Sequence, residues 1–324
     1  MEQQKWIGID VAKSAFQAAL VPGGATRSFP NNEQGAAALV DWAKTLPDFQ
    51  GHIAMEATGI YSRTLAAILH DLKAHPAIIN PYHIHAYGLS FGRRNKTDPI
   101  DARLITQFAN ERQPRLWEPP DAASEGLKVL LEQRESAKLE QDRMNKQVSV
   151  LTNPPQILKK RQLDNETYIK KLEAEIRKHE RQNEQLAQNT KLLCTIPGVG
   201  NWTARALLAC TNNLKDFTRR SVASYTGLAP CVYHSGTYHG GGHIPHTGPR
   251  LIKKYLYMAA QANTQTRMKD NLLAQHYQKL RANHKTGKQA LCALMRKIIL
   301  IARALIQTQK PYDPKIHGQA LVEN

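Results

Sequence analysis

Four carboxylates in the first third of the chain have the residue type and spacing for metal-dependent phosphodiester chemistry. Asp10 and Glu56 each end a short apolar run, and Asp98 and Asp101 stand three residues apart. That spacing puts two side chains on one face of a helical turn, and the ends of adjacent parallel strands share one sheet edge. Mg²⁺ prefers oxygen ligands, and two such ions about 4 Å apart stabilise both the attacking and the leaving oxygen. The four acids therefore predict a Mg²⁺ site with two ions, for which Mn²⁺ is a substitute.

Both halves of this set have an alternative interpretation. Asp98-Pro99-Ile100-Asp101 is also a good helix start, with an N-cap, a proline at the first helical position and an acid near the positive end of the helix dipole. Gly8-Ile9-Asp10 after a strand also occurs in sugar kinases and actin-like ATPases. A kinase is disfavoured because no later glycine-rich adenosine-binding strand is evident.

The elements that must position these acids are strands followed by helices. Alternating apolar runs predict strands and helical spacing predicts helices, with a turn at Pro22-Gly23-Gly24. The order is three strands, then helix, strand, helix, strand, helix, which favours a mixed sheet with antiparallel pairs first and parallel pairs later. The predicted strands cover 6–9, 14–21, 26–29, 52–55 and 77–79, and the predicted helices 33–46 and 58–72.

A polar, helix-favouring connector follows, from about residue 122 to 193, interrupted at Asn153-Pro154-Pro155. Its second half carries a short heptad seam with two polar positions. Such a seam favours an antiparallel hairpin or a register-fixing dimer contact over a long independent coiled coil, and we expect a homo-oligomer. The seam residues are Ile169, Leu172, Ile176, His179, Asn183 and Leu186.

The positive charge is concentrated in the last segment of the chain. The net charge is +17, and residues 190–324 hold 19 Lys and Arg against 4 Asp and Glu. Such a field is typical of a nucleic-acid-binding domain, because cations that neutralise phosphates release counterions. Within it, Gly198 and Gly200 flank a valine in a pattern like a helix-hairpin-helix turn, whose backbone N–H groups contact a DNA phosphate; the alternative is a tight turn between core helices. Loop-rich residues 233–249 and helices over 251–266 and 289–305 follow.

The chain resembles the DEDD-type insertion-sequence transposases, a family that includes the pilin-gene invertase and the bridge-RNA-guided recombinases. The resemblance runs almost end to end and is carried by six ordered motifs: Gly8-Ile-Asp-Val-Ala-Lys13, Met55-Glu-Ala-Thr-Gly-Ile-Tyr61, Ile79-Asn-Pro81, Asn95-Lys-Thr-Asp-Pro-Ile-Asp-Ala102, Ile196-Pro-Gly-Val-Gly200 and Tyr225-Thr-Gly-Leu-Ala-Pro230.

The resemblance implies three domains. Residues 1–118 would form an α/β RuvC-like domain of the ribonuclease H type, with Asp10, Glu56, Asp98 and Asp101 as its catalytic, metal-binding tetrad. Residues 119–190 would form an α-helical coiled-coil connector. Residues 191–324 would form a basic, mainly α-helical transposase domain.

The same resemblance implies a serine nucleophile at Ser235, in the Ser-Gly pair after the Gly-Leu-x-Pro motif. A phosphoserine link conserves the energy of the cut bond and allows rejoining without ATP; without the family, a serine in a glycine-rich loop is most often a turn residue. The sequence departs from the family at Pro245 and His246, where relatives carry Ser and Lys. His246 replaces a lysine only when protonated. Arg250, Lys253 and Lys254 are candidate DNA-phosphate contacts or a solvated basic face.

Two other chemistries are weaker. Irregular spacing and neighbouring glycines disfavour a zinc site among Cys231, His234, His239, His243 and His246. Tyr225, Tyr233 and Tyr238 suggest a tyrosine recombinase, which does not need an acidic metal site. The four cysteines have no paired spacing and are treated as reduced thiols.

We therefore expect a Mg²⁺-dependent DNA transposase or site-specific recombinase of the pilin-gene-invertase type, cutting and rejoining strands through a serine-linked intermediate. The alternatives are a Holliday-junction-resolving type of structure-selective nuclease and a catalytically inactive nucleic-acid-binding relative. Expected partners are DNA, a second copy of the chain (a dimer, with a tetramer at synapsis) and, as the resemblance leaves open, a structured guide RNA from the same element. Without a signal peptide or membrane span, a cytoplasmic protein is expected, nucleoid-associated in bacteria when bound.

Overall fold

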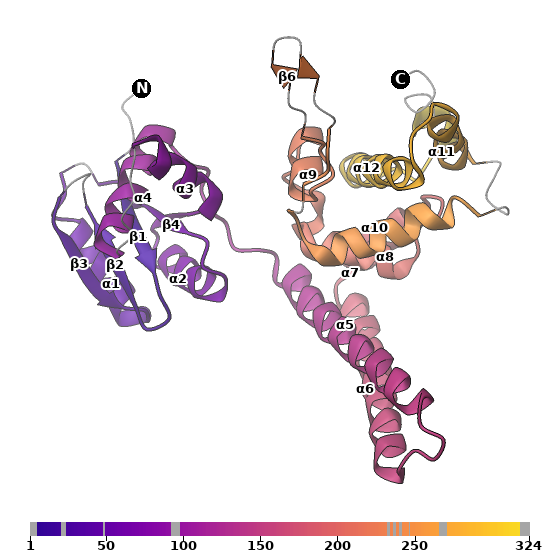
Figure 1. Cartoon of the computed structure of the whole chain (residues 1–324). Coiled ribbons are helices and arrows are strands. Elements are labelled where there is room, and N and C mark those ends of the chain that lie inside the picture. The colour runs from indigo at the N-terminus through magenta and orange to yellow at the C-terminus, as the bar shows by residue number, and fades with distance from the viewer. Residues whose placement is uncertain are drawn as a thin grey trace. The chain divides into compact units, whose positions relative to one another are not determined.

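The structure is a computed structural model that describes residues 5–20, 24–47, 49–91, 98–231, 234–235, 238–239, 242–245, 247–265 and 271–317. The chain divides into two units, Met1–Pro119 and Pro120–Asn324, and each is described by itself (Figure 1). The division falls between two consecutive prolines. Because proline restricts its own backbone and that of the residue before it, such a pair favours an extended connection.

A five-stranded sheet of order β3-β2-β1-β4-β5 is the centre of the first unit. β1 and β3 both pair antiparallel with β2, whereas β4 lies parallel to β1 and β5 lies parallel to β4. The predicted mixed sheet, with antiparallel pairs first, is confirmed; residues 21–23 of the predicted turn lie outside the described residues. The strands are β1 Trp6–Val11, β2 Ala15–Ala19, β3 Thr26–Pro30, β4 His52–Glu56 and β5 His75–Ile79.

Helices cover both faces of this sheet (Figure 1). Successive strand residues point to opposite faces. Ile7 and Ile9 of β1 therefore pack with α1 (Glu33–Ala43) and α2 (Ile60–Asp71), whereas Trp6 packs with α3 (Pro81–Ser90) and α4 (Asp98–Arg112). Asparagine side chains cap two of these helices: Asn32 accepts from the Gly35 N–H at 2.9 Å, and Asn80 from the Tyr82 N–H at 2.9 Å.

We expect one buried histidine to make the stability of the first unit dependent on pH. His52 is 4% exposed, and its ring centre lies 4.9 Å from that of Trp6 and 5.2 Å from that of His75. Burial, and secondarily the nearby His75, lowers the pKa of His52. The unfolded chain then binds a proton more readily than the folded chain, so stability falls as the pH drops from above the unfolded pKa towards the lower folded pKa.

We expect the free energy of unfolding of the wild type to decrease between pH 7.5 and pH 5.5 by at most about 1.4 kcal/mol per pH unit from this one group. His52→Phe should reduce this slope. The measurement is urea unfolding at several pH values, with exposed His85→Gln as the matched control. An unchanged slope in His52→Phe would contradict the assignment.

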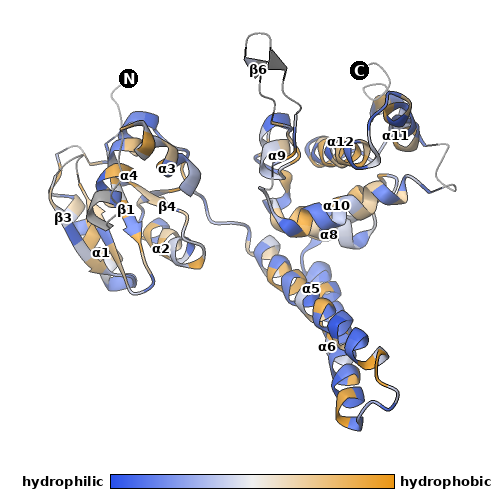
Figure 2. Cartoon of the chain, viewed as in Figure 1, coloured by the Kyte–Doolittle hydropathy of each residue, from blue (hydrophilic) through white to orange (hydrophobic). Residues whose placement is uncertain are grey.

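The second unit begins with two long antiparallel helices, α5 (Ala122–Ser149) and α6 (Gln156–Gln182). His179 Nε2 lies 2.7 Å from the Ala123 carbonyl oxygen, and Asn165 Nδ2 donates to the Ala137 carbonyl at 3.0 Å. The bend lies at the predicted Pro154-Pro155 break, and part of the heptad seam packs within the chain, since Ile176 is fully buried with Leu127 and Leu131 of α5. Figure 2 shows many hydrophilic residues along both helices, with hydrophobic residues between them.

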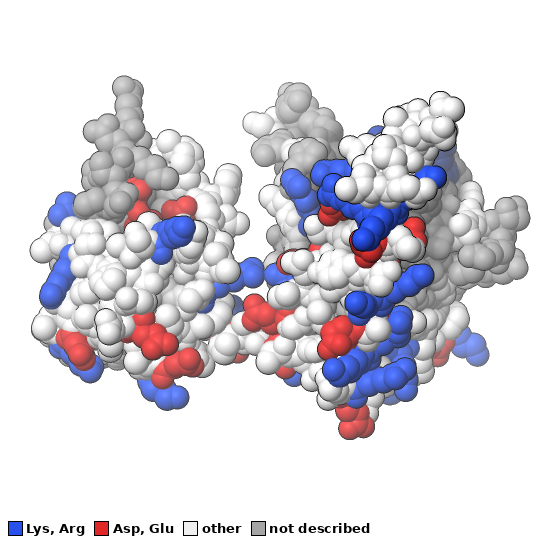
Figure 3. All heavy atoms as spheres, turned by 90° about the horizontal axis from the view of Figure 1, so that it is seen from below, with Lys and Arg blue, Asp and Glu red and all other residues white. Residues whose placement is uncertain are grey.

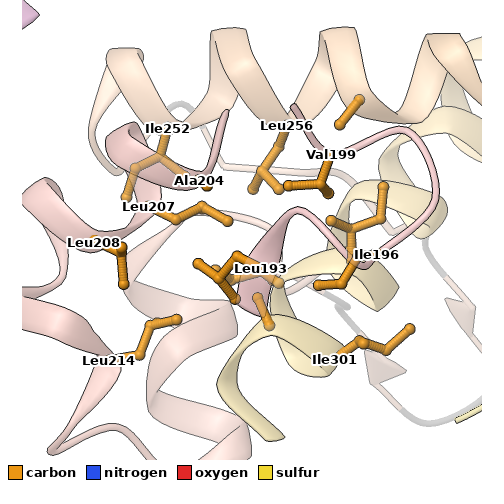
Figure 4. Close-up of a cluster of buried hydrophobic side chains, with 14 of the residues drawn as sticks. Leu193, Ile196, Val199, Ala204, Leu207, Leu208, Leu214, Ile252, Leu256 and Ile301 are labelled. Atoms are coloured by element: carbon orange, nitrogen blue, oxygen red, sulfur yellow. The ribbon is translucent and has the colours of Figure 1, made fainter. Parts of the chain in front are cut away.

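The rest of the second unit is mainly helical, and its helices share one hydrophobic core. Leu193, Ile196, Val199, Leu207 and Leu256 belong to this core, as Figure 4 shows. The same core includes Leu127 and Leu131 at the base of the hairpin, so it extends across residue 190. The remaining elements are α7 Glu184–Leu193, α8 Asn201–Cys210, η1 Asn212–Leu214, α9 Arg219–Tyr225, β6 His234–Ser235, β7 Tyr238–His239, α10 Arg250–Ala262, α11 Leu272–Ala282 and α12 Gly287–Thr308.

No helix within the described ranges has the length and apolar character needed to cross a membrane.

Candidate active site

Two of the four predicted acids lie at the ends of neighbouring parallel strands. Asp10 is the penultimate residue of β1, and Glu56 is the last residue of β4. The register pairs Gly8 with Ala54 and Ile9 with Met55, so Asp10 and Glu56 follow in the same row. Both residues are partly buried. The predicted strand ends thus bring these two acids to one edge of the sheet.

α4 runs along β1 and points its start towards the same edge. Asn110, near the end of α4, donates from Nδ2 to the Trp6 carbonyl at 2.8 Å and accepts the Trp6 N–H at 3.0 Å. One turn earlier, the Thr106 hydroxyl accepts the Gly8 N–H at 2.9 Å. Four helix residues rise about 6 Å and two strand residues about 6.6 Å, so the next step pairs Ala102 with Asp10.

This helical alignment carries the other two acids. Asp101 directly precedes Ala102 and is partly buried, and Asp98 begins α4 one turn before it. Asp98 is thus described by its backbone; its side chain lies outside the described part. Within the described residues, no group of three or more His, Cys, Asp and Glu side chains is arranged to hold a metal ion. The backbone therefore directs all four acids to the carboxyl edge of β1 and β4, while three of the four side chains are described.

Three residues that sequence reasoning missed hold α4 on β1. Gly8 allows the close approach: a Cβ there would lie 2.2 Å from the Thr106 nitrogen and 2.5 Å from the Ala102 carbonyl oxygen. The Thr106 hydroxyl also lies 3.0 Å from the Ala19 carbonyl oxygen, so it bridges the backbones of β1 and β2. A sequence signal exists, because Thr106 and Asn110 stand four apart beside the buried Ile105 and Ala109.

We expect Gly8→Ala to push α4 away from β1, because a backbone contact of this length has no flexible side chain that can yield. The expected loss in the free energy of unfolding is about 1–3 kcal/mol, typical of overpacking. Urea unfolding measures it, with Thr106→Ser, which keeps the bridging hydroxyl, as control. Equal stability of Gly8→Ala and wild type would show that α4 is not tightly packed there.

Ser235 lies on a short two-stranded arm of the second unit. β6 pairs antiparallel with β7, which sets Ser235 opposite Tyr238, and Ser235 is exposed. Further down, the backbones of Cys231 and His243 form a bridge: the Cys231 N–H donates to the His243 carbonyl at 2.8 Å, and the reverse bond is 3.1 Å. We call residues 231–249 the serine arm. Gly236, Thr237 and His246 lie outside the described residues.

Two glycines close the base of the serine arm. Gly227 has φ +63° and Gly248 has φ +91°, values that favour glycine. A Cβ on Gly227 would lie 2.0 Å from the Thr247 carbonyl oxygen, and one on Gly248 would lie 2.7 Å from the Tyr225 carbonyl oxygen. The glycine of the Tyr225–Pro230 motif therefore has a structural role, because it packs against the segment that leads from the arm to α10.

Comparison with known proteins decides the family. A DEDD-type IS110 transposase model matches residues 7–153, and a model of the IS116/IS110/IS902 transposase family matches residues 190–278. The pilin gene-inverting protein of Moraxella bovis is 32% identical over 324 residues, covering 96% of this chain and 98% of the relative. The chain belongs to the IS110 family of transposases. The Moraxella lacunata pilin gene-inverting protein matches equally well, also at 32% identity over 96% of this chain and 98% of its own length.

A third relative of the IS110 family is the insertion element IS110 uncharacterized 43.6 kDa protein of Streptomyces coelicolor, which is 34% identical over 126 residues, covering 39% of this chain and 30% of the relative. The chain is accordingly an enzyme of DNA transposition or recombination, and DNA is its substrate. The DEDD-type family model also indicates divalent metal use.

The predicted DNA-contacting residues of this IS110-family chain differ in their surroundings. Gly198 packs inside, since a Cβ on it would lie 2.3 Å from the Asn263 Nδ2 and that amide donates to the Pro197 carbonyl at 2.9 Å. Gly200 is exposed at the N-cap of α8. Gly198 therefore has the surroundings of the tight-turn alternative, and the DNA contact of Gly200 stays a prediction.

The three basic residues at the start of α10 also differ. Arg250 is exposed, whereas Lys253 Nζ donates to the Pro245 carbonyl at 3.1 Å and Lys254 Nζ forms an ion pair with Glu135. Figure 3 shows Lys and Arg side chains over one face of the second unit, with acidic side chains between some of them. Sequence reasoning missed the partners of both lysines, because Pro245 and Glu135 lie in other segments.

Proposed function

We propose that this IS110-family enzyme cuts and rejoins DNA through an acidic metal site, Asp10, Glu56, Asp98 and Asp101, together with a serine nucleophile, Ser235. The observation that carries the first half is the convergence of the ends of β1 and β4 with the start of α4 at one sheet edge. The pilin gene-inverting relatives, matched over nearly their full length, support recombination as the outcome of the cutting.

The proposed ligands suit a hard divalent ion. The set is carboxylate only, without thiol or imidazole donors, and this chemistry fits Mg²⁺, with Mn²⁺ as a substitute, better than Zn²⁺. When bound, a pair of such ions supplies Lewis-acid stabilisation of the charge on the attacking and leaving oxygens. The protein itself contributes the spacing, because strand register and the packing of α4 set which carboxylates share the edge.

The proposed serine step is a transesterification that conserves bond energy. The Ser235 oxygen bonds to the scissile phosphorus and its hydroxyl proton leaves; the bond to the departing strand end breaks, and that oxygen takes up a proton. Rejoining is the reverse step, with the hydroxyl of another strand attacking the phosphoserine. The exposure of Ser235 on its arm supports this role, because a nucleophile for a DNA phosphate must be accessible.

The proposal includes the finer architecture. The strand order, with antiparallel pairs followed by parallel pairs, supports a RuvC-like domain of the ribonuclease H type over residues 1–118. We assign the connector role to residues 119–190 as a coiled-coil hairpin and the transposase domain to 191–324. We also propose a homo-oligomer, dimeric and tetrameric at synapsis. Val150 and Ile157 at the hairpin bend, 80% and 75% exposed, support an unfilled apolar contact there.

For DNA contacts we retain Gly200 and Arg250, the exposed members of the predicted set. A structured guide RNA from the same element is a further proposed partner, and the assay below therefore includes RNA from the native locus. Action at the bacterial nucleoid follows from the substrate.

The test uses the full chain, Mg²⁺, a two-site plasmid and RNA from the native locus. We expect rejoined strands and protein-linked DNA from the wild type, and neither product from Asp10→Ala or Ser235→Ala. Asp41→Asn, an exposed acid on α1, and Ser224→Ala, an exposed serine on α9, are matched controls that should retain both products.

Each of the other outcomes would assign a different function to this chain. Cleavage that survives Ser235→Ala but not Asp10→Ala would overturn the serine step and favour a junction-resolving nuclease. DNA binding without any cleavage, also after Pro245→Ser and His246→Lys are combined, would favour a catalytically inactive binding protein.

A further inference from the structure

The serine arm is fixed at its base by contacts from two sides. On one side, Gly227 and Gly248 bring the Tyr225–Pro230 motif against the segment that leads from the arm to α10. On the other, Lys253 reaches up from α10 and donates from Nζ to the Pro245 carbonyl at 3.1 Å. The same Nζ would lie 2.7 Å from a Cβ on Gly227. The ammonium group therefore lies between Gly227, just before the arm, and Pro245, near its end.

The surroundings of Lys253 differ from those of an ordinary phosphate contact. The residue is partly buried, and burial lowers the pKa of its ammonium group, although the nearby Cys292 raises it. Arg250, one turn earlier on α10, is exposed. Cations that bind DNA neutralise phosphates at the protein surface. Arg250 is exposed and can do so, whereas the Lys253 ammonium group binds a backbone carbonyl of the protein.

We propose that Lys253 is a positioning residue that holds the base of the serine arm and so aims Ser235. This proposal rests on the proposed role of Ser235 for its effect on catalysis, but the hold on the arm can be measured without catalysis. Pro245, one of the two residues that depart from the family pattern, is compatible with this hold, because the contact uses its carbonyl oxygen and not a side chain or an N–H group.

The first measurement is amide hydrogen exchange of Cys231 and His243, whose N–H groups close the arm. Loss of a hydrogen bond from a charged donor should raise their exchange by about tenfold or more in Lys253→Met. Lys253→Arg, which keeps a cationic donor, should restore most of the protection. Exchange in the core of α12 serves as the internal standard for global stability. Unchanged exchange at both amides would overturn the proposal.

The second measurement separates positioning from phosphate contact. Each lost phosphate contact reduces the slope of log affinity against log salt by about 0.9. Arg250→Met should show this reduction, whereas Lys253→Met should keep the wild-type slope and lose about tenfold in the rate of protein-linked DNA formation. A reduced slope in Lys253→Met would assign it to a phosphate and overturn the proposal. If Ser235→Ala still forms the adduct, the serine step fails, and the exchange experiment still decides the role of Lys253.

Discussion

Replacing Arg134 by methionine is expected to destabilise the second unit by about 3–5 kcal/mol, the usual cost of leaving buried charges without their partner. Arg134 is 3% exposed and lies on α5. Its guanidinium donates to Glu173 of α6 at 2.7 Å and to Glu135 at 2.9 Å, and its Cζ lies 3.6 Å from the ring centre of Trp202 on α8. One side chain therefore joins the hairpin to the helical core.

Glu135 extends this network to α10. It accepts hydrogen bonds from Tyr255 and Lys254. Burial alone raises the pKa of Glu135, but these two bonds and the nearby cations outweigh it and hold the pKa below its ordinary value. Burial and the same carboxylate raise the pKa of the Tyr255 hydroxyl. Arg134→Met therefore removes one cationic partner from the buried Glu135 carboxylate and the cationic partner of Glu173.

The control for Arg134→Met is Arg161→Met on the same hairpin. Arg161 pairs with Glu140 at 2.5 Å, but the two side chains are 65% and 49% exposed, so the expected loss is about 0–1 kcal/mol. Urea unfolding measures both variants. Replacing Arg134, Glu135 and Glu173 together by apolar residues should recover part of the stability. Similar losses in the free energy of unfolding for Arg134→Met and Arg161→Met would show that burial does not determine how much the ion pairs of Arg134 stabilise the fold.

The second large effect is expected from Asp101→Asn. This change removes the charge while it keeps the size of the side chain, so α4 should remain packed on β1. Changes to residues that only support metal ligands cost about 10–100-fold in activity, so loss of a ligand should lower strand cleavage by at least about a hundredfold. The measurement is the initial cleavage rate against Mg²⁺ concentration, together with DNA affinity, which should not change.

Asp142→Asn, at an exposed position of α5, provides the acid-to-amide control for the Asp101 experiment. Partial recovery of Asp101→Asn at higher metal concentration would support a ligand role. Wild-type cleavage by Asp101→Asn would remove this residue from the site and favour the alternative that it only begins a helix near the dipole.

The acidic edge was largely predictable, because its signals are local. Apolar runs that stop at Asp10 and Glu56 mark strand ends, and a three-residue spacing within a helix start marks Asp98 and Asp101. Predicted strand and helix limits in the first unit agree with the observed ones to within a few residues, except that helix 33–46 ends at Ala43. The strand limits could be predicted because successive residues of a strand point to opposite faces of the sheet, so burial imposes a two-residue hydrophobic period that is visible in the sequence.

The second unit was less predictable, because its contacts join distant segments. Short α9 and α11 were not predicted, since packing rather than a strong periodic signal stabilises them. The predicted heptad seam continues through Asn183, but the structure ends α6 there, because the backbone of Asn183 leaves the helical conformation at φ −122°. The partners of Lys253 and Lys254 lie in the arm and in α5, respectively, so no local pattern distinguishes these lysines from surface cations.

The contact of α4 with β1 also sets an order of events during synthesis. The Gly8 N–H donates to the Thr106 hydroxyl and the Trp6 N–H donates to Asn110 Oδ1, so these bonds join residues 98 and 104 positions apart. A ribosome-bound chain that ends before α4 holds Asp10 and Glu56 but lacks the helix that delivers the other two acids. Contacts this distant in sequence form late, because the intervening loop must close first. The four acids of the proposed metal site are therefore brought together only after all of α4 has left the ribosome.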